Sequence, residues 1–257
     1  MKKWFYAAML LLGLSIMMVS CNKEDDDSSI SKPSGKEKGH AYVDLGLPSG
    51  TLWATCNVDA SSPEEYGGYY AWGETETKTD YSWETYKWFS GDWWIGGGDY
   101  YPVFSKYVTN ESGIEGRLDN KTILDPEDDV AYVKWGGKWR MPTLKDFKEL
   151  QKECAYELVI YNGKNGLKFV GPNGKSIFFP YAGYRYYSSN QDIKVIDGAG
   201  NYGYYWASTR NENYWSYYGS GMRIGISGWF SEEGMMGCFE DRARGLGFCI
   251  RPVFPKK

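Results

Sequence analysis

The segment Trp135–Cys154, WGGKWRMPTLKDFKELQKEC, decides how the rest of the chain can fold. Pro142 excludes a central β-strand because it has no backbone N–H to donate. Thr143, followed three residues later by Asp146, has the pattern of a capping box, in which each side chain accepts a hydrogen bond from the other residue's backbone N–H. We therefore expect a helix to begin at Leu144.

Apolar residues recur along this helix at steps of three and four residues, which places them on one face. The apolar positions are Leu144, Phe147, Leu150 and Cys154, and the polar positions between them are Lys145, Lys148, Glu149 and Lys152. The sequence therefore predicts an amphipathic helix with one buried side.

The N-terminus has the pattern of a secretion signal. Lys2 and Lys3 precede an apolar run from Trp4 to Val19, which is shorter than the about 20 residues of a membrane-spanning helix. The run ends in Met18-Val19-Ser20-Cys21, which resembles the lipobox of bacterial lipoproteins. We expect residues 1–20 to be a signal peptide and Cys21 to carry a lipid. The alternative is an ordinary signal peptide with an incidental cysteine.

A tether is expected to follow this anchor. The acidic segment Asn22–Asp27 (NKEDDD) resembles the export tag of surface lipoproteins in Bacteroidota, which implies an outer-membrane protein facing the cell exterior. The same charges would also solvate a tether without any export role. Residues 28–39 are mostly Ser, Lys, Pro, Gly and Glu, a composition that cannot bury a core. We therefore expect residues 21–39 to be a lipidated flexible linker and residues 40–257 to be one domain.

The composition indicates a sheet-rich domain that does not bind nucleic acid. The chain has 12 Trp, 23 Tyr and 32 Gly with few long helical patterns, which favours a turn-rich β structure. Its formal net charge is −4. Because phosphate neutralisation needs clustered Lys and Arg, this charge argues against a nucleic-acid partner.

Turn residues between apolar runs predict several strands. A hairpin is expected over His40–Val58 with its turn at Pro48–Gly50, and a meander over Leu158–Tyr161, Leu167–Val170 and Ser176–Pro180 with turns at 162–166 and 172–174. Further strands are expected at Gly203–Ser208, Tyr214–Tyr218, Met222–Phe230 and Phe248–Phe254.

The segment Asp125–Asp129 (DPEDD) gathers four carboxylates in five residues. Its spacing does not fit an EF-hand, which needs ligands at alternate positions and a distal Glu. An Asp at the cap followed by Pro and acids in the first turn is typical of a helix start. We therefore expect a helix capped by Asp125 that continues through Trp135 to Gly136, and no metal site.

Four cysteines remain besides the proposed anchor: Cys56, Cys154, Cys238 and Cys249. An even number in an oxidising compartment allows three pairings. We favour Cys56 with Cys154 and Cys238 with Cys249, and the alternative is that two or all four are buried free thiols.

Several separated segments carry a resemblance to a known family. They are Val43–Ala54 (VDLGLPSGTLWA), Asp125–Asp129, Ala131–Thr143 (AYVKWGGKWRMPT), Tyr205–Thr209 (YWAST) and Gly247–Val253 (GFCIRPV). Together they resemble the Fibrobacter succinogenes major paralogous domain family over residues 41–254. That family is related to the C-type-lectin-like fold. The resemblance implies an α+β domain, a twisted antiparallel sheet with two helices, whose long aromatic-rich loops carry the variable surface.

The residues give little support to an enzyme. The fold is shared with formylglycine-generating enzymes, whose copper-binding cysteines are close in sequence, whereas Cys238 and Cys249 are separated by ten residues. His40 is the only histidine, which limits hydrolytic triads and zinc sites. Glu232-Glu233 and Glu240-Asp241 would suit a glycosidase, but charged turns explain them as well. We expect no catalysis and no cofactor.

Aromatic loops favour a binding module for a glycan or a protein, because rings stack on sugar faces and anchor protein partners. The candidate ligand-binding residues are Trp93, Trp94, Tyr100, Tyr101, Arg210, Asn211, Asn213, Tyr214, Trp215 and Tyr217. Two alternatives are that most of these rings fill the core, and that the protein is a structural or adhesive subunit of a surface assembly.

Replacing Cys21 by Ser tests the lipid anchor. Because the thiol is the group that would carry the lipid, we expect Cys21→Ser to move the protein from the membrane fraction to the soluble fraction in a partitioning experiment. Unchanged partitioning with membranes would show that Cys21 is not the anchor.

Overall fold

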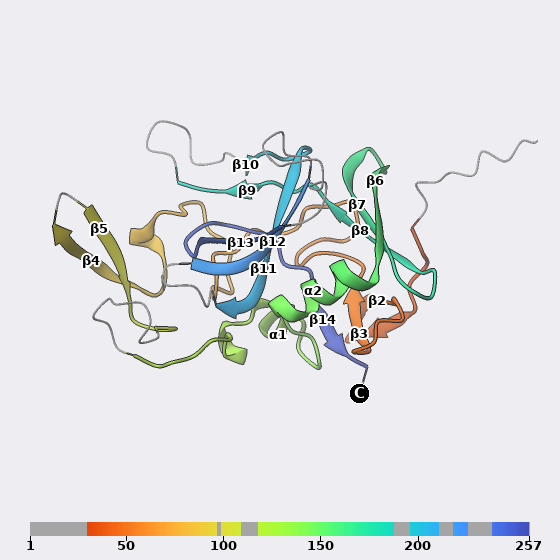
Figure 1. Ribbon diagram of the computed structural model, residues 1–257, viewed down its shortest axis with the longest axis horizontal. Coiled ribbons are helices and arrows are strands. Elements are labelled where there is room, and N and C mark those ends of the chain that lie inside the picture. Colours follow the sequence, from red (N-terminus) through yellow and green to blue (C-terminus); the bar gives the residue numbers. More distant parts are fainter. Residues whose placement is uncertain are drawn as a thin grey trace, which may run out of the picture.

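The computed structural model describes residues 30–96, 99–108, 118–187, 196–210, 218–225 and 238–256, and for residues 92–102 and 238–241 it describes the backbone alone. The predicted signal peptide, Cys21 and the acidic segment lie outside the described residues. Within them, antiparallel sheets and two α-helices make up the structure, which confirms the α+β class (Figure 1). Neither of these α-helices has the length and apolarity needed to span a membrane.

Three sheets form the body of the molecule. The first contains β1 (Gly35–Glu37), β2 (His40–Asp44), β3 (Thr51–Ala54) and β14 (Val253–Pro255) in the order β1-β2-β3-β14. The second is the meander of β6 (Ala155–Tyr161), β7 (Lys164–Val170) and β8 (Ser176–Pro180). The third contains β11 (Tyr202–Arg210), β12 (Tyr218–Gly225) and β13 (Cys238–Ala243).

Two hairpins and two short 3-10 helices complete the described chain. They are β4 (Phe89–Gly96) with β5 (Asp99–Phe104), β9 (Tyr184–Arg185) with β10 (Ile196–Asp197), η1 (Trp83–Thr85) and η3 (Pro126–Asp128). Figure 1 shows the β4–β5 hairpin at one end of the molecule, away from the other sheets. The sequence analysis did not predict this hairpin.

Helix α2 (Leu144–Glu153) forms as the sequence predicts. Thr143 Oγ1 accepts a hydrogen bond from the Asp146 N–H at 3.2 Å, and the Asp146 carboxylate accepts one from the Thr143 N–H at 2.7 Å, which completes the capping box. Phe147 and Leu150 are fully buried, whereas Leu144 is half-buried. The helix packs against β11 and β12.

Helix α1 (Val130–Trp135) ends where it was predicted to end but begins later. Asp129, not Asp125, is the cap, and its carboxylate accepts hydrogen bonds from the N–H groups of Ala131 at 2.9 Å and Tyr132 at 3.1 Å. The prediction was wrong at this end because Pro126–Asp128 form a separate 3-10 turn. Gly136 ends the helix with a φ of +65°.

The folded part begins before His40, so the predicted linker is too long. β1 pairs with β2 in the register Gly35↔Tyr42. Before it, the Ser31 N–H donates to the Ser176 hydroxyl on β8 at 3.1 Å, and the Ser176 N–H donates to the Ser31 hydroxyl at 2.9 Å. Neither the pairing of β1 with β2 nor these serine contacts require apolar side chains, so the composition did not reveal them.

The predicted hairpins are confirmed with different boundaries. β2 and β3 pair as expected, and so does the meander. The β6–β7 turn contains only Asn162 and Gly163, whose φ values of +46° and +77° suit a two-residue hairpin turn, so the predicted five-residue turn is wrong. The described part of the predicted strand at 222–230 ends at Gly225 in β12. Residues 248–252 cross between sheets through isolated bridges and do not form a continuous strand.

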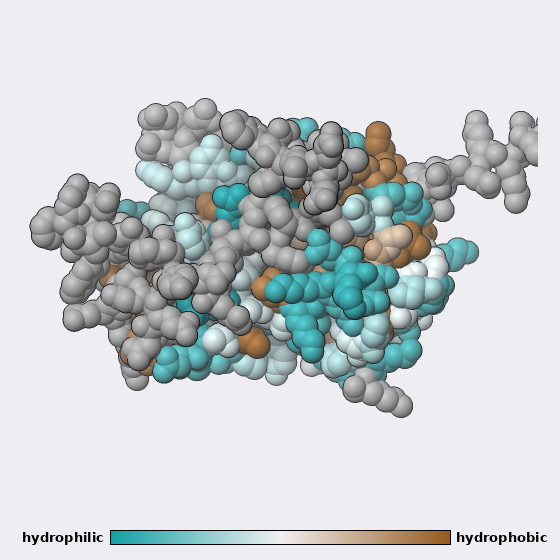
Figure 2. All heavy atoms as spheres, viewed as in Figure 1, coloured by the Kyte–Doolittle hydropathy of each residue, from teal (hydrophilic) through white to brown (hydrophobic). Residues whose placement is uncertain are grey.

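Aromatic side chains fill much of the core. Trp53, Trp72, Trp139 and Trp206 are fully buried, and the other tryptophans with described side chains are half-buried. The indole N–H groups of Trp72, Trp139 and Trp206 bond across the chain, for example from Trp72 Nε1 to the Ala207 carbonyl at 2.8 Å. Exposed surface is largely hydrophilic on the face drawn in Figure 2, with hydrophobic side chains gathered near β6.

Removing the α2 cap should cost stability. In Thr143→Ala the Asp146 N–H loses its acceptor, so we expect the free energy of unfolding to fall by about 1 kcal/mol and the melting temperature by about 2–4 °C. Urea unfolding and calorimetry measure both. Thr143→Ser keeps the acceptor and should remain close to the wild type; equal losses in both variants would contradict the capping role.

Candidate functional site

A tyrosine-walled hollow of about 600 Å³ lies between three separated parts of the chain. We call it the tyrosine pocket. Its lining residues are Asp59, Tyr66, Gly67, Gly68, Tyr69, Thr77, Lys78, Thr79, Tyr81, Arg185 and Ile196.

Glycines let one wall of the tyrosine pocket approach the neighbouring loop. Gly67 has a φ of +75°, and a Cβ there would come within 2.2 Å of the Val58 carbonyl oxygen. A Cβ at Gly68 would come within 2.7 Å of the Asp59 carboxylate. These contacts explain why a Gly-Gly pair separates Tyr66 from Tyr69.

Two of the tyrosine rings are fixed by their hydroxyl groups. Tyr69 donates to the Ala182 carbonyl at 2.6 Å, and Tyr81 donates to the Tyr69 carbonyl at 2.7 Å. Both side chains are buried, and burial raises the pKa of Tyr69 and raises that of Tyr81 to about 12. Both phenols therefore stay neutral at physiological pH.

The charged groups around the pocket differ in their partners. Asp59 contacts the Lys134 ammonium at 3.1 Å and accepts a hydrogen bond from the Tyr70 hydroxyl. Lys78 contacts Glu74 at 2.9 Å. The Arg185 guanidinium lies 5.2 Å from the centre of the Tyr69 ring, and its Nε is buried without a hydrogen-bond acceptor. Arg185 is therefore a cation with room for an anionic partner.

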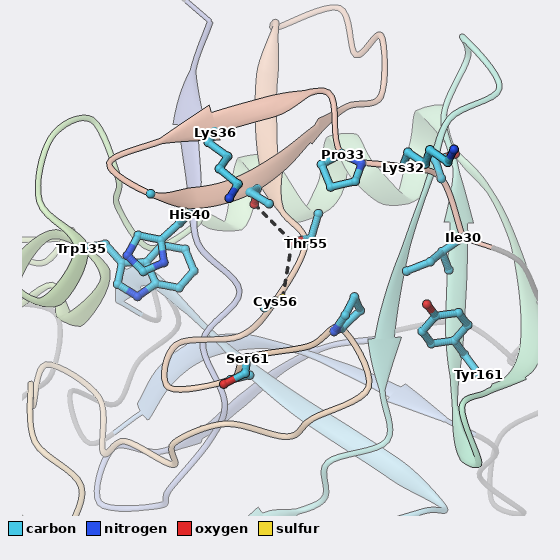
Figure 3. A pocket seen from close by; sticks show the side chains of 15 residues that line it. Ile30, Lys32, Pro33, Lys36, His40, Thr55, Cys56, Ser61, Trp135 and Tyr161 are labelled. Atoms are coloured by element: carbon cyan, nitrogen blue, oxygen red, sulfur yellow. Dashed lines mark hydrogen bonds between the residues drawn. The ribbon is translucent and has the colours of Figure 1, made fainter.

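A second hollow of about 600 Å³, the His40 groove, is shown in Figure 3. His40 and Trp135 lie on one side, Tyr161 and Ile30 on the other, and Cys56 between them. The imidazole stacks on the Trp135 indole with ring centres 3.8 Å apart and planes 6° apart. Burial lowers the pKa of His40, so the ring is neutral at physiological pH.

The imidazole of the His40 groove is not placed to activate the thiol. Among the described contacts, the Cys56 Sγ lies 3.4 Å from the Thr55 hydroxyl, and no hydrogen bond joins it to His40. The groove thus provides a flat aromatic wall and a half-buried thiol without a Cys–His pair.

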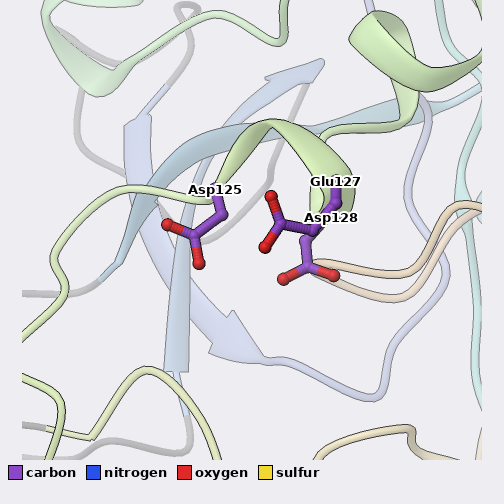
Figure 4. Close-up of side chains that lie close together, drawn as sticks. All are labelled: Asp125, Glu127 and Asp128. Carbon is purple, nitrogen blue, oxygen red and sulfur yellow. The ribbon is translucent and has the colours of Figure 1, made fainter.

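Figure 4 shows the acidic cluster of Asp125, Glu127 and Asp128. Lys106 Nζ lies 2.7 Å from Asp125, 3.5 Å from Glu127 and 2.5 Å from Asp128. Hydrogen bonds from Lys106 hold the pKa of Asp125 below its ordinary value. Burial would raise the pKa of Asp128, but hydrogen bonds from Lys106, Lys87 and Tyr107 outweigh burial and lower it. The carboxylates are therefore compensated by lysine side chains of the protein itself.

The predicted ligand residues fall into three groups. The register of β4 and β5 pairs Trp93 with Tyr101 and Trp94 with Tyr100, so the backbone brings these four residues together. The structure describes only the backbone of these four residues. Arg210 is 3% exposed at the end of β11, and its role in ligand binding stays a prediction. Asn211, Asn213, Tyr214, Trp215 and Tyr217 lie outside the described residues.

The two predicted disulfides are not formed, because Cys56, Cys154 and Cys249 are free thiols. Cys154 lies in the main core directly after α2, and Cys56 lines the His40 groove. Cys249 is fully buried, and its backbone forms an isolated β-bridge with Tyr205. Burial raises the pKa of Cys154 to about 12 and also raises that of Cys249. Cys238 pairs through its backbone with Arg223 in β12, and its side chain lies outside the description.

Sequence reasoning missed the tyrosine pocket because its walls are far apart in the chain. The only local signals were the Tyr66-Gly67-Gly68-Tyr69 pattern and the position of Arg185 in the tyrosine-rich segment 184–187. Of the paired carboxylates, Glu232-Glu233 lie outside the described residues, and Glu240-Asp241 are described only as backbone in β13.

No protein-family model, curated protein or solved structure matches this chain. The lectin-like resemblance and the function therefore depend on the residues and contacts of the chain itself.

Removing Lys106 should destabilise the protein mainly at neutral pH. The lowered pKa values of Asp125 and Asp128 mean that their ion pairs stabilise the fold above about pH 4 and that this stabilisation is lost as the pH falls. We expect Lys106→Met to lower the free energy of unfolding by about 2 kcal/mol at pH 7 and by less at pH 3, as measured by urea unfolding.

Lys121→Met is the matched control, because among the described residues the Lys121 ammonium forms an ion pair with Asp125 alone and its side chain is 43% exposed. It should change stability by no more than about 0.5 kcal/mol. A loss in Lys106→Met that is the same at both pH values would contradict the electrostatic explanation.

Proposed function

We propose that this protein is a non-enzymatic binding module that takes a glycan or protein ligand in the tyrosine pocket. The observation that carries the proposal is the combination of fixed aromatic walls with donors and acceptors around one hollow of about 600 Å³. Ligand sites commonly combine apolar walls with a few well-placed polar groups. Because Tyr69 and Tyr81 are already held by hydrogen bonds, little side-chain entropy is lost when a ligand packs on them.

Protonation states support binding without turnover. The single imidazole of the chain belongs to the His40 groove and is stacked on Trp135. In the tyrosine pocket, the Asp59 carboxylate is engaged by Lys134 and Tyr70, and the phenols of Tyr69 and Tyr81 hold their protons. General acid–base catalysis needs a group whose pKa lies near the working pH.

Contacts between the family-like segments support a lectin-like fold as part of the proposal. The Ser208 N–H donates to the Pro142 carbonyl at 2.7 Å, and the Arg140 N–H donates to the Val253 carbonyl at 3.0 Å. Tyr205 also forms a bridge with Cys249. The segments YWAST, WRMPT and GFCIRPV thus meet in space, as they would if they defined one structural centre.

The location of the protein is part of the same proposal. A lipid on Cys21 would hold it at the outer membrane, facing the cell exterior, and the acidic segment after Cys21 supports that orientation by its resemblance to export tags. The folded part begins by Ser31, so only a short tether would separate the pocket from the membrane surface.

A structural or adhesive subunit is the second candidate, favoured by an apolar stripe on β6. Tyr156, Leu158 and Ile160 are 38%, 40% and 64% exposed, and β6 is at the edge of its sheet. Exposed apolar edge strands are templates for pairing with another chain. Assembly through β6 would leave the tyrosine pocket unaffected.

Ligand arrays with matched variants test the binding function. The purified mature protein is applied to a broad glycan array and, in parallel, used to capture protein ligands. Truncating the half-buried Tyr66 removes one wall of the pocket, so we expect Tyr66→Ala to reduce the signal at least tenfold. Tyr132→Ala is the control because Tyr132 is 46% exposed on α1 and does not line the pocket.

Thermal unfolding of each variant separates lost binding from lost structure. Binding that survives in Tyr66→Ala but disappears in the double variant Trp93→Ala with Trp94→Ala, or in Trp215→Ala, would move the site to those loops. Silence on the array together with Tyr66-dependent capture of a protein would identify a protein ligand. Silence in both experiments would contradict the binding function.

A further inference from the structure

We infer that Arg185 makes the tyrosine pocket selective for a carboxylate-bearing sugar. This inference rests on the proposed binding function, because it concerns the same pocket. Three features of the pocket support it: a guanidinium without an acidic partner among the described residues, a tyrosine ring beside that guanidinium, and the threonines Thr77 and Thr79 in the lining.

The half-buried guanidinium of Arg185 has fewer polar partners among the described residues than the two fully buried arginines, although these also leave one nitrogen each without an acceptor. Arg251 donates to the Asn57 side chain at 2.8 Å, and Arg244 donates to the Tyr107 carbonyl at 2.7 Å. For Arg185 the described contact is the Tyr69 ring, its Nε has no acceptor, and no carboxylate among the described residues lies within ion-pair distance. A buried charged donor without an acceptor is costly, and an anionic ligand would remove that cost.

The backbone holds Arg185 in place before any ligand arrives. Its N–H donates to the Gly247 carbonyl at 2.8 Å, and the Gly247 N–H donates back to the Arg185 carbonyl at 2.8 Å. On the other side, Arg185 pairs with Ile196 in the β9–β10 hairpin. Because the main chain is fixed on both sides, no backbone conformational entropy is lost at Arg185 when a ligand binds.

The charge balance of the pocket suits one carboxylate better than a phosphate. Lys78 is paired with Glu74, and Asp59 is paired with Lys134, so among the described residues that line the pocket Arg185 is the one charge without an ionic partner. A planar carboxylate matches the guanidinium fork in a bidentate pair. A phosphate carries more negative charge, which the nearby Asp59 carboxylate would repel.

A sugar fits the remaining walls. Thr77 and Thr79 provide hydroxyl groups, Asp59 provides an acceptor, and the tyrosine rings provide flat apolar surface. A pyranose ring has both an apolar face and a belt of hydroxyl groups, so it can use all of these at once. A hexuronate adds the carboxylate that Arg185 lacks.

The test compares a hexuronate oligosaccharide with its methyl ester, which has the same ring without the charge. Calorimetric titration of the mature protein should show the acid binding at least tenfold tighter than the ester. Arg185→Met keeps a side chain of similar length without charge or donors, so it should bind both ligands with the weaker affinity of the ester. Arg185→Lys restores charge without the fork and should recover only part of the preference.

Lys164→Met is the matched charge control. Lys164 is exposed and its ammonium lies 5.0 Å from the centre of the Tyr66 ring, but it does not line the pocket. This variant should keep the full preference for the acid. Melting temperatures of all variants establish that each one is folded.

The outcomes separate the inference from the proposed function. Equal affinities of acid and ester for the wild type, or an acid preference that persists in Arg185→Met, would overturn the role of Arg185 while leaving Tyr66-dependent glycan binding intact. Arg185-dependent binding of a Glu peptide over its Gln counterpart, without hexuronate binding, would overturn the sugar assignment. Absence of any Tyr66-dependent ligand would refute both proposals.

Discussion

The guanidinium of Arg251 holds together the loop on which both hollows depend. It is fully buried and donates to the Ala54 carbonyl at 3.1 Å, to the Thr55 carbonyl at 2.5 Å and to the Asn57 side chain at 2.8 Å. Asn57 in turn donates to the Tyr66 carbonyl at 2.8 Å. Burial lowers the pKa of Arg251, and the planar fork compensates by reaching several acceptors that a lysine could not reach together. The C-terminal segment therefore fixes one wall of the His40 groove and one wall of the tyrosine pocket at the same time.

The abundance of aromatic residues has two different physical roles. Three tryptophans, Trp72, Trp139 and Trp206, are buried in the core, where each indole N–H donates a hydrogen bond to a carbonyl from a distant part of the chain. These bonds satisfy the polar atom of a large apolar side chain and link separate segments. Tyrosines have a hydroxyl at the far end of the ring, so Tyr69 and Tyr81 can anchor that end inside while the rings still line a hollow. The number of aromatic residues alone therefore overstates the aromatic surface that is available for stacking on a ligand.

The sequence predicted features that depend on neighbouring residues and missed those that depend on distant ones. The capping box of Thr143 and the helix end at Gly136 are confirmed because each requires only a few adjacent residues. β1 was missed because its pairing with β2 uses backbone groups, which composition does not show. The pairing of cysteines failed as a prediction because parity does not say which thiols are near each other. Arg185 became a candidate only when the fold brought it beside the segment that contains Tyr69.

Buried carboxylates of this protein are compensated by nearby donors, whereas Arg185 has no carboxylate within ion-pair distance among the described residues. Asp146 is paired with Arg140 at 2.7 Å, and Asp129 receives backbone N–H groups from α1 and from Met141. The chain has a formal net charge of −4, so its long-range field opposes an anionic ligand. Salt screens that field beyond about 10 Å, whereas a direct contact between a carboxylate and the half-buried Arg185 guanidinium is screened less. An acidic protein can therefore recognise an acidic ligand through a direct contact between the ligand carboxylate and the Arg185 guanidinium.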